Sequence, residues 1–185
     1  LEPRLVEALV EKVWPVRAEQ CRRLALLGVD VIMLSGDIAM QNSMLIDPVL
    51  WRRYFKPYYR RILSYAKQAR PAYFMFHSDG NCSSVIEDLI EVGFDIINPI
   101  QPESMDPKEI KERFGQAITL HGTISVQRTL PFGTPEEVRC EVMQRIRDCG
   151  RDGGFILAPS NVVLEDTPLE NLLALYETAQ AWRWF

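Results

Sequence analysis

Apolar and polar positions follow two repeating patterns along the chain. Longer segments carry apolar residues three or four positions apart, which is typical of one face of a helix, whereas five short runs are apolar almost throughout and predict buried strands. Proline, aspartate or threonine opens several of the helical segments, and Pro15 is expected to kink or divide the first. The expected helices cover about residues 3–27, 47–69, 82–92, 106–115, 134–149 and 166–181, and the expected strands about 29–34, 72–76, 94–97, 117–120 and 154–157.

The order of these elements, a helix followed by five strand-helix units, predicts an α/β fold in one domain over residues 1–185. Two architectures fit: an open doubly wound sheet, or part of an eight-stranded barrel. An open sheet usually gathers its chemistry at one switch point, often with a glycine-rich phosphate loop, and the sequence has no GxGxxG or Walker motif. We therefore predict a partial (β/α)8 TIM barrel that comprises about the last five strand-helix units.

A complete barrel typically takes about 250 residues, and an open edge of apolar parallel strands is prone to unwanted pairing. The chain has 185 residues. We therefore expect the remainder of the barrel to come from further sequence or from another chain.

Polar or turn-forming residues follow every apolar run. Because the carboxyl ends of parallel strands lie on one face of a barrel, these residues are expected to converge on one site. Both histidines of the chain are among them. The sequences at the five ends are Ser35-Gly36-Asp37, His77-Ser78-Asp79-Gly80-Asn81, Asn98-Pro99-Ile100-Gln101, His121-Gly122-Thr123 and Ala158-Pro159-Ser160-Asn161.

Asp37, His77 and Asp79 are the candidate catalytic residues. His77 and Asp79 lie two positions apart and could form an acid/base pair or provide two ligands to a divalent metal. The alternative is structural: Asp79 caps the next helix and His77 binds a buried backbone group. Asp37 could bind a substrate N–H, stabilise positive charge, take up a proton, or simply form a turn.

Further side chains at the strand ends offer hydrogen bonds to a polar substrate or, alternatively, organise loops. The candidate substrate-binding residues are Gln41, Asn98, His121, Ser160 and Asn161.

Composition narrows the range of functions. The formal net charge of −4 argues against a nucleic-acid surface, and no apolar stretch approaches the roughly 18 residues that span a membrane. The four cysteines lack zinc-finger spacing, and the sequence has neither a GxSxG elbow nor an HExxH motif. We expect a cytoplasmic protein that binds a small molecule and neither nucleic acid nor membranes.

At these motifs the chain resembles the C-terminal part of the uroporphyrinogen decarboxylase superfamily. The matching pieces are Gly36-Asp37-Ile38-Ala39-Met40-Gln41, Phe55-Lys56-Pro57-Tyr58, His77-Ser78-Asp79-Gly80, His121-Gly122-Thr123, Gly154-Phe155-Ile156-Leu157-Ala158-Pro159 and Asp166-Thr167-Pro168. The resemblance implies an eight-stranded barrel with its active cleft at the carboxyl ends of the strands.

The superfamily includes tetrapyrrole decarboxylases and methyltransferases that work with corrinoid proteins. In the coenzyme M-type methyltransferases, a His-x-Cys pair and a later cysteine hold zinc, which activates a thiol. Here His77 matches the histidine, whereas Asp79 and Asn161 stand at the cysteine positions. The decarboxylases have a Gly-His-Gly stretch whose histidine corresponds to about Asn161, so the chain departs from both branches.

The resemblance thus favours a methyltransferase-like enzyme that acts with a corrinoid protein, with a divalent metal such as zinc at His77 and Asp79 as a possible cofactor. Two alternatives stay open. One is a cofactor-free uroporphyrinogen decarboxylase of porphyrin biosynthesis, and the other is a non-catalytic module for ligand binding or corrinoid docking.

Overall fold

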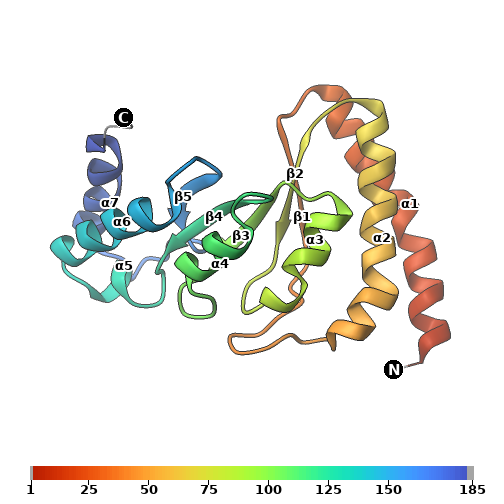
Figure 1. Cartoon of the computed structure of the whole chain (residues 1–185), viewed down its shortest axis with the longest axis horizontal. Helices are drawn as coiled ribbons and strands as arrows, with labels where there is room; N and C mark the ends of the chain where they lie inside the picture. Colours follow the sequence, from red (N-terminus) through yellow and green to blue (C-terminus); the bar gives the residue numbers. More distant parts are fainter. Residues whose placement is uncertain (1, 183–185) are drawn as a thin grey trace.

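The computed structural model describes residues 2–182, which form five strands and the helices that connect them (Figure 1). The strands are β1 (Val31–Ser35), β2 (Tyr73–His77), β3 (Ile96–Ile100), β4 (Thr119–Ile124) and β5 (Phe155–Pro159). The α-helices are α1 (Pro3–Leu27), α2 (Pro48–Ala69), α3 (Ile86–Val92), α4 (Pro107–Phe114), α5 (Thr129–Phe132), α6 (Pro135–Cys149) and α7 (Leu169–Ala181), and the 3-10 turn η1 (Ser83–Val85) precedes α3.

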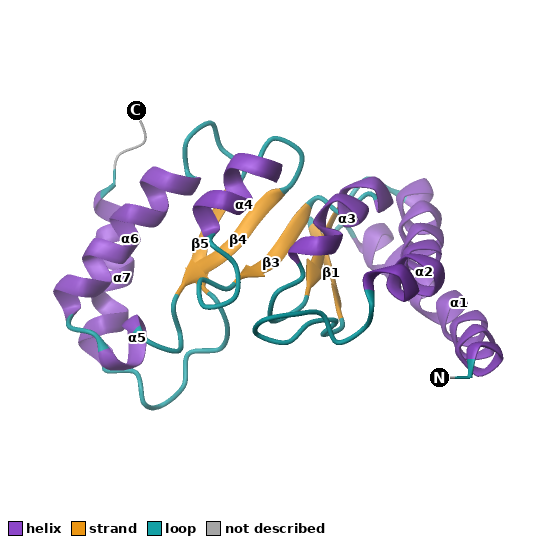
Figure 2. Cartoon of the chain, turned by 60° about the horizontal axis from the view of Figure 1, so that its bottom comes forward, coloured by secondary structure: helices purple, strands orange, loops and turns teal. Residues whose placement is uncertain are grey.

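All five strands are parallel and lie side by side in the order in which they occur in the sequence. In a doubly wound sheet the strand order reverses at a switch point, so that later strands are added at the opposite edge. In a barrel each new strand is added at the same edge. The sheet does not close on itself, and its strands run across the middle of the molecule between the helices (Figure 2). The prediction of a partial TIM barrel is therefore confirmed.

The strands extend further than their apolar runs. Gly36 donates its backbone N–H to the His77 carbonyl at 3.1 Å, and Ser78 donates to the Asn98 carbonyl at 2.9 Å. Backbone pairing does not depend on side-chain polarity, so the ladder continues through the polar residues that follow each apolar run. His77, Asn98 and His121 consequently lie within strands rather than beyond their ends.

Helix starts follow the capping signals closely. Asp47 accepts from the Val49 N–H at 2.7 Å, Asp106 accepts from the Lys108 N–H at 2.9 Å, and Thr134 forms a capping box with Glu137. Helix α1 runs unbroken through Pro15, which differs from the division that we considered. The sequence pattern also missed α5, because four residues are too few to show a helical period.

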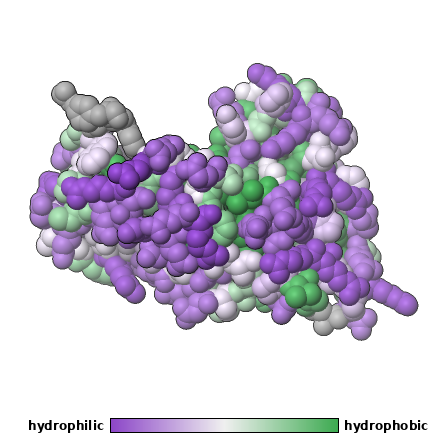
Figure 3. All heavy atoms as spheres, viewed as in Figure 1, coloured by the Kyte–Doolittle hydropathy of each residue, from purple (hydrophilic) through white to green (hydrophobic). Residues whose placement is uncertain are grey.

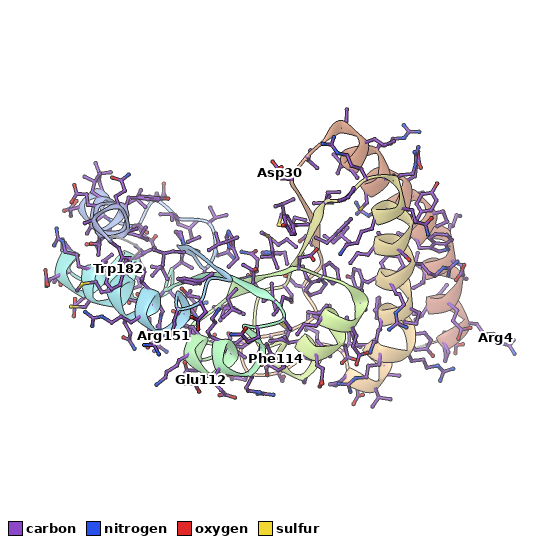
Figure 4. The ribbon with its side chains drawn as sticks, turned by 45° about the horizontal axis from the view of Figure 1, so that its top comes forward. Arg4, Asp30, Glu112, Phe114, Arg151 and Trp182 are labelled. Carbon is purple, nitrogen blue, oxygen red and sulfur yellow. The ribbon has the colours of Figure 1, made fainter. Side chains whose placement is uncertain are left out.

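The helix-facing side of the sheet packs into two hydrophobic clusters. The larger joins β1–β4 to α1–α4 and contains an aromatic group in which Phe76 contacts Tyr59 and Phe94 edge to face, with ring centroids 5.4 and 5.1 Å apart. The smaller joins the end of β4 to α5, α6 and α7. Arg4 near the start of α1 and Trp182 after α7 lie at opposite ends of the molecule (Figure 4).

The opposite side of the sheet is largely uncovered by the described residues. Val31, Met33, Tyr73 and Ile156 share this face by register, and they are 41%, 57%, 63% and 40% exposed. The space-filling view shows hydrophobic atoms in the hollow between the two ends of the molecule (Figure 3). This face corresponds to the interior of a barrel. None of the helices within residues 2–182 is long and apolar enough to cross a membrane.

Phe76→Ala should lower the free energy of unfolding by about 3–5 kcal/mol, because it opens a cavity in a fully buried aromatic group. Chemical denaturation monitored by circular dichroism measures this change. Gln68→Ala on the exposed side of α2 is the control and should alter stability by no more than about 0.5 kcal/mol. Equal effects of the two substitutions would contradict this description of the core.

Candidate functional site

Polar side chains form a row across the uncovered face of the sheet. Ser35, His77 and Asn98 are register partners on β1, β2 and β3, and His121 follows on β4. Alternation along each strand turns these residues away from the helix-packed core. The row lies near the carboxyl ends of the strands, where catalytic groups of TIM barrels are found.

Hydrogen bonds connect three members of this row. His77 Nδ1 lies 2.5 Å from Asn98 Oδ1, and Asn98 Nδ2 lies 2.6 Å from His121 Nδ1. Burial, and to a lesser degree the neighbouring His77, lower the pKa of His121 below its ordinary value. His121 therefore stays neutral at physiological pH and can accept the hydrogen bond from the Asn98 amide.

Asp37, His77 and Asp79 come together beside the row. One ligand atom from each lies within 4.8 Å of the others, and His77 Nε2 is 3.9 Å from Asp37 Oδ1. Asp37 Oδ1 also accepts from the Asp79 backbone N–H at 3.0 Å, which joins the loops after β1 and β2. The three residues that the sequence singled out as candidate catalytic groups thus form one cluster.

The loop after β2, which carries Asp79, is held in place by hydrogen bonds of its residues Ser78 and Gly80. Ser78 is buried and accepts the Ile38 N–H at 3.0 Å, while the Gly80 N–H donates to Gln101 Oε1 at 3.2 Å. Gly80 has a φ of +81°, and a Cβ there would lie 2.4 Å from the Met40 carbonyl oxygen. Only glycine therefore lets the chain pass Met40 and present Asp79.

Asn161 connects the cluster to the last strand of the sheet. Its Nδ2 donates to Asp79 Oδ2 at 2.7 Å, and its Oδ1 accepts the Val162 N–H at 2.6 Å. The other Asp79 oxygen, Oδ1, is buried and has no hydrogen-bond partner among the described residues. A carboxylate in this state can bind a cation or a donor group of a ligand.

A pocket of about 490 Å³ opens beside Asp79 and Asn161. Gln41, Gln101 and Gln127 add amide groups to its lining. The remaining lining residues are Gly80 and the apolar residues Ala39, Met40, Val126, Val162 and Leu164. The part of the pocket that this chain forms is thus apolar and amide-rich, with one carboxylate.

Gln127 was not predicted from the sequence. The predicted strand ended at residue 120, whereas β4 continues to Ile124, so the residues after its true end were overlooked. Glu103 and Glu141 accept hydrogen bonds from Ser125, Glu103 from its hydroxyl and Glu141 from its N–H, which fixes the loop that carries Gln127. The polar residues Ser125 and Gln127, directly after the true end of β4, would have been the signal.

Two residues near the site are buried and do not line the pocket. Ser160 donates its N–H to the Ile124 carbonyl at 2.8 Å, and its hydroxyl has no partner among the described residues. Cys82 is fully buried, and this burial raises the pKa of its thiol to about 12. Cys82 therefore remains protonated and does not replace the thiolates that zinc would require.

The cluster provides two carboxylates and one imidazole, and one of its members, Asp79, also lines the amide-rich pocket, whereas Asp37 and His77 do not. Oxygen and nitrogen donors of this kind suit divalent cations of intermediate or hard character. Without a cation, His77 Nε2, which lies 3.9 Å from Asp37 Oδ1, can accept a proton and pass it on. Donors from the neighbouring amides can orient a polar ligand in the pocket.

Comparison with known proteins identifies relatives in one family. The chain is 24% identical over 179 residues to uroporphyrinogen decarboxylase from Crocosphaera subtropica, covering 97% of this chain and 48% of the relative. It is 24% identical over 183 residues to uroporphyrinogen decarboxylase 2, chloroplastic, from Arabidopsis thaliana, covering 99% and 44%. For uroporphyrinogen decarboxylase from Trichodesmium erythraeum the identity is 26% over 180 residues, covering 97% and 48%.

A solved structure of a methyltransferase from Methanosarcina mazei shares the fold, with a TM-score of 0.78 and 22% sequence identity. The match covers 97% of this chain and 50% of that protein, so the chain spans about half the length of the relatives that it matches. The sequence profile of the family described as uroporphyrinogen decarboxylase (URO-D) matches residues 1–182. Because that match covers almost the whole chain and agrees with the motifs at the strand ends, the chain belongs to the uroporphyrinogen decarboxylase family.

Proposed function

We propose that the protein carrying this chain is a methyltransferase of the uroporphyrinogen decarboxylase superfamily that exchanges a methyl group with a corrinoid protein. The observation that carries the proposal is the Asp37–His77–Asp79 cluster, which adjoins an amide-rich pocket through its member Asp79. A small methylated molecule would place its heteroatom at the cluster and its apolar part against the pocket. The structural neighbour named as a methyltransferase supports this choice by its fold.

The charge of the cluster also bears on substrate choice. Asp37 and Asp79 bring two carboxylates to the site, and the pocket residues of this chain are neutral apart from Asp79. A substrate that carries several carboxylates would meet like charge there, which costs free energy in a poorly hydrated cleft. A neutral or cationic methyl donor is therefore the better match.

In the proposed reaction, the bond between the methyl group and the heteroatom breaks while the methyl group joins the reduced corrinoid. The heteroatom leaves with the electron pair and takes up a proton. We assign the delivery of that proton to His77, whose Nε2 lone pair, 3.9 Å from Asp37 Oδ1, would take a proton from water and pass it to the heteroatom. The roles of Gln41 and Asn161 are to orient the substrate and to hold Asp79.

The donor set of Asp37, His77 and Asp79 also fits a divalent cation. Asp79 Oδ1 is buried without a partner among the described residues, and Asn161 occupies only the second oxygen. A bound cation would supply Lewis-acid polarisation of the heteroatom. The absence of sulfur ligands at positions 79 and 161 disfavours the thiol-activating zinc site of the coenzyme M-type enzymes.

The second candidate is decarboxylation of a tetrapyrrole, which the names of the curated relatives favour. Asp37 and Asp79 could then stabilise a positively charged pyrrole. Basic groups for the substrate carboxylates would have to come from outside this chain's part of the pocket.

Replacing Asp79 by Asn should weaken binding of Mn²⁺ or Zn²⁺ at least about tenfold, because one ligand and one negative charge are lost. Isothermal titration of the purified protein measures the affinity. Asp152→Asn is the matched control, since Asp152 lies in the turn before β5, and it should bind the metals as the unaltered protein does. Identical affinities for the Asp79 variant would show that the cluster holds no cation.

The methyl-transfer proposal predicts a methylcobalamin absorbance signal when the protein is mixed with a methylated substrate and a reduced corrinoid protein. His77→Gln should slow this signal about 100-fold or more, because it removes the proposed proton donor. Gln68→Ala should leave the rate unchanged. Formation of coproporphyrinogen from uroporphyrinogen, without methyl transfer, would favour the decarboxylase instead, and ligand binding without any turnover would favour a binding module.

A further inference from the structure

The side chain of Asn98 lies between the only two histidines of the chain. Its carbonyl oxygen faces His77, and its NH2 group faces His121. These two ends of an amide are not equivalent, because the oxygen only accepts and the nitrogen only donates hydrogen bonds. Each histidine must therefore present the complementary state of its Nδ1 atom.

His77 has to donate from Nδ1, because Asn98 Oδ1 at 2.5 Å cannot donate. A neutral imidazole carries one proton, so its Nε2 is left with a free lone pair. That atom lies 3.9 Å from Asp37 Oδ1, within the cluster that also contains Asp79. The lone pair is thus presented where a cation or a proton would be held between carboxylates.

His121 is forced into the opposite state. Asn98 Nδ2 donates to His121 Nδ1 at 2.6 Å, so Nδ1 must be unprotonated and the proton must sit on Nε2. Burial of His121 favours the same neutral form. Two histidines in the same row of the sheet consequently carry their protons on different ring nitrogens.

We propose that Asn98 is a positioning residue that fixes opposite tautomers in His77 and His121, and thereby keeps the His77 Nε2 lone pair available to the Asp37–Asp79 cluster. In free histidine the Nε2–H form is the commoner tautomer, so His77 without Asn98 would mostly carry its proton on the atom that faces Asp37. The backbone around Asn98 supports this role, since β2 and β3 pair His77 with Asn98 in register. Only the use made of the lone pair depends on the proposed function.

Replacement of Asn98 by Asp or by Ala distinguishes control of the histidine tautomers from a merely structural role of Asn98. An Asp carboxylate accepts from both sides, so in Asn98→Asp the His77 proton should stay on Nδ1 while that of His121 moves from Nε2 to Nδ1. Asn98→Ala removes both hydrogen bonds, so the Nε2–H form should gain population in His77 and remain in His121. Asn42→Ala, a change at an exposed asparagine, should leave both tautomers unaltered.

The test is two-dimensional 1H–15N NMR of the imidazole rings in protein labelled with 15N-histidine, at about pH 8.5, well above the ordinary histidine pKa of about 6.5. His77→Gln and His121→Gln assign the signals. Thermal unfolding of each variant verifies that it is folded, and the Asn98→Asp variant provides the readout if Asn98→Ala is not. We expect opposite tautomers in the unaltered protein and a change at His121 alone in Asn98→Asp.

A proton on His77 Nε2 in the unaltered protein would overturn the proposal, whether the ring is neutral or charged. So would an Asn98→Asp variant in which the His121 tautomer does not move. Neither result depends on an activity assay, so failure of the tautomer proposal is distinguishable from failure of the methyl-transfer proposal. Loss of methyl transfer with the predicted tautomers intact would instead count against the proposed reaction.

Discussion

In-register pairing of parallel strands is the constraint on which the rest of this structure depends. It sorts side chains into two sets, with Phe74, Phe76 and Leu120 packed against the helices and His77, Asn98 and His121 aligned on the other face. A shift of one residue in a strand would turn that strand's polar residue towards the helices and its core residues away from them. Packing and chemistry are therefore specified by the same hydrogen-bond ladder, and neither can change alone.

The order of helices and strands could be predicted because proline, glycine and capping residues punctuate strongly apolar runs. Asp37, His77 and Asp79 could be found because carboxyl ends of parallel strands converge. The sequence does not show the lengths of the strands beyond their apolar residues, so Gln127 was missed and His77 was placed one step too far from the sheet. The orientation of the Asn98 amide depends on two neighbours more than twenty residues away on either side, which no local pattern records.

Family membership and site chemistry carry different information in this chain. Identities of 24–26% to curated relatives accompany a common fold, because packing tolerates exchange among apolar residues of similar size. The site tolerates substitution less well. A thiolate in place of Asp79 or Asn161 would change which metal ions the site could bind.

The hydrogen bond between Asn161 and Asp79 spans the sheet from the loop after β2 to the loop after β5. These loops belong to parts of the chain that pack into different hydrophobic clusters. A slight change in the curvature of the sheet would alter the distance between them and free the second Asp79 oxygen. Formation of this hydrogen bond therefore depends on the curvature of the sheet. A ligand that prefers Asp79 held by Asn161 would favour one curvature by mass action.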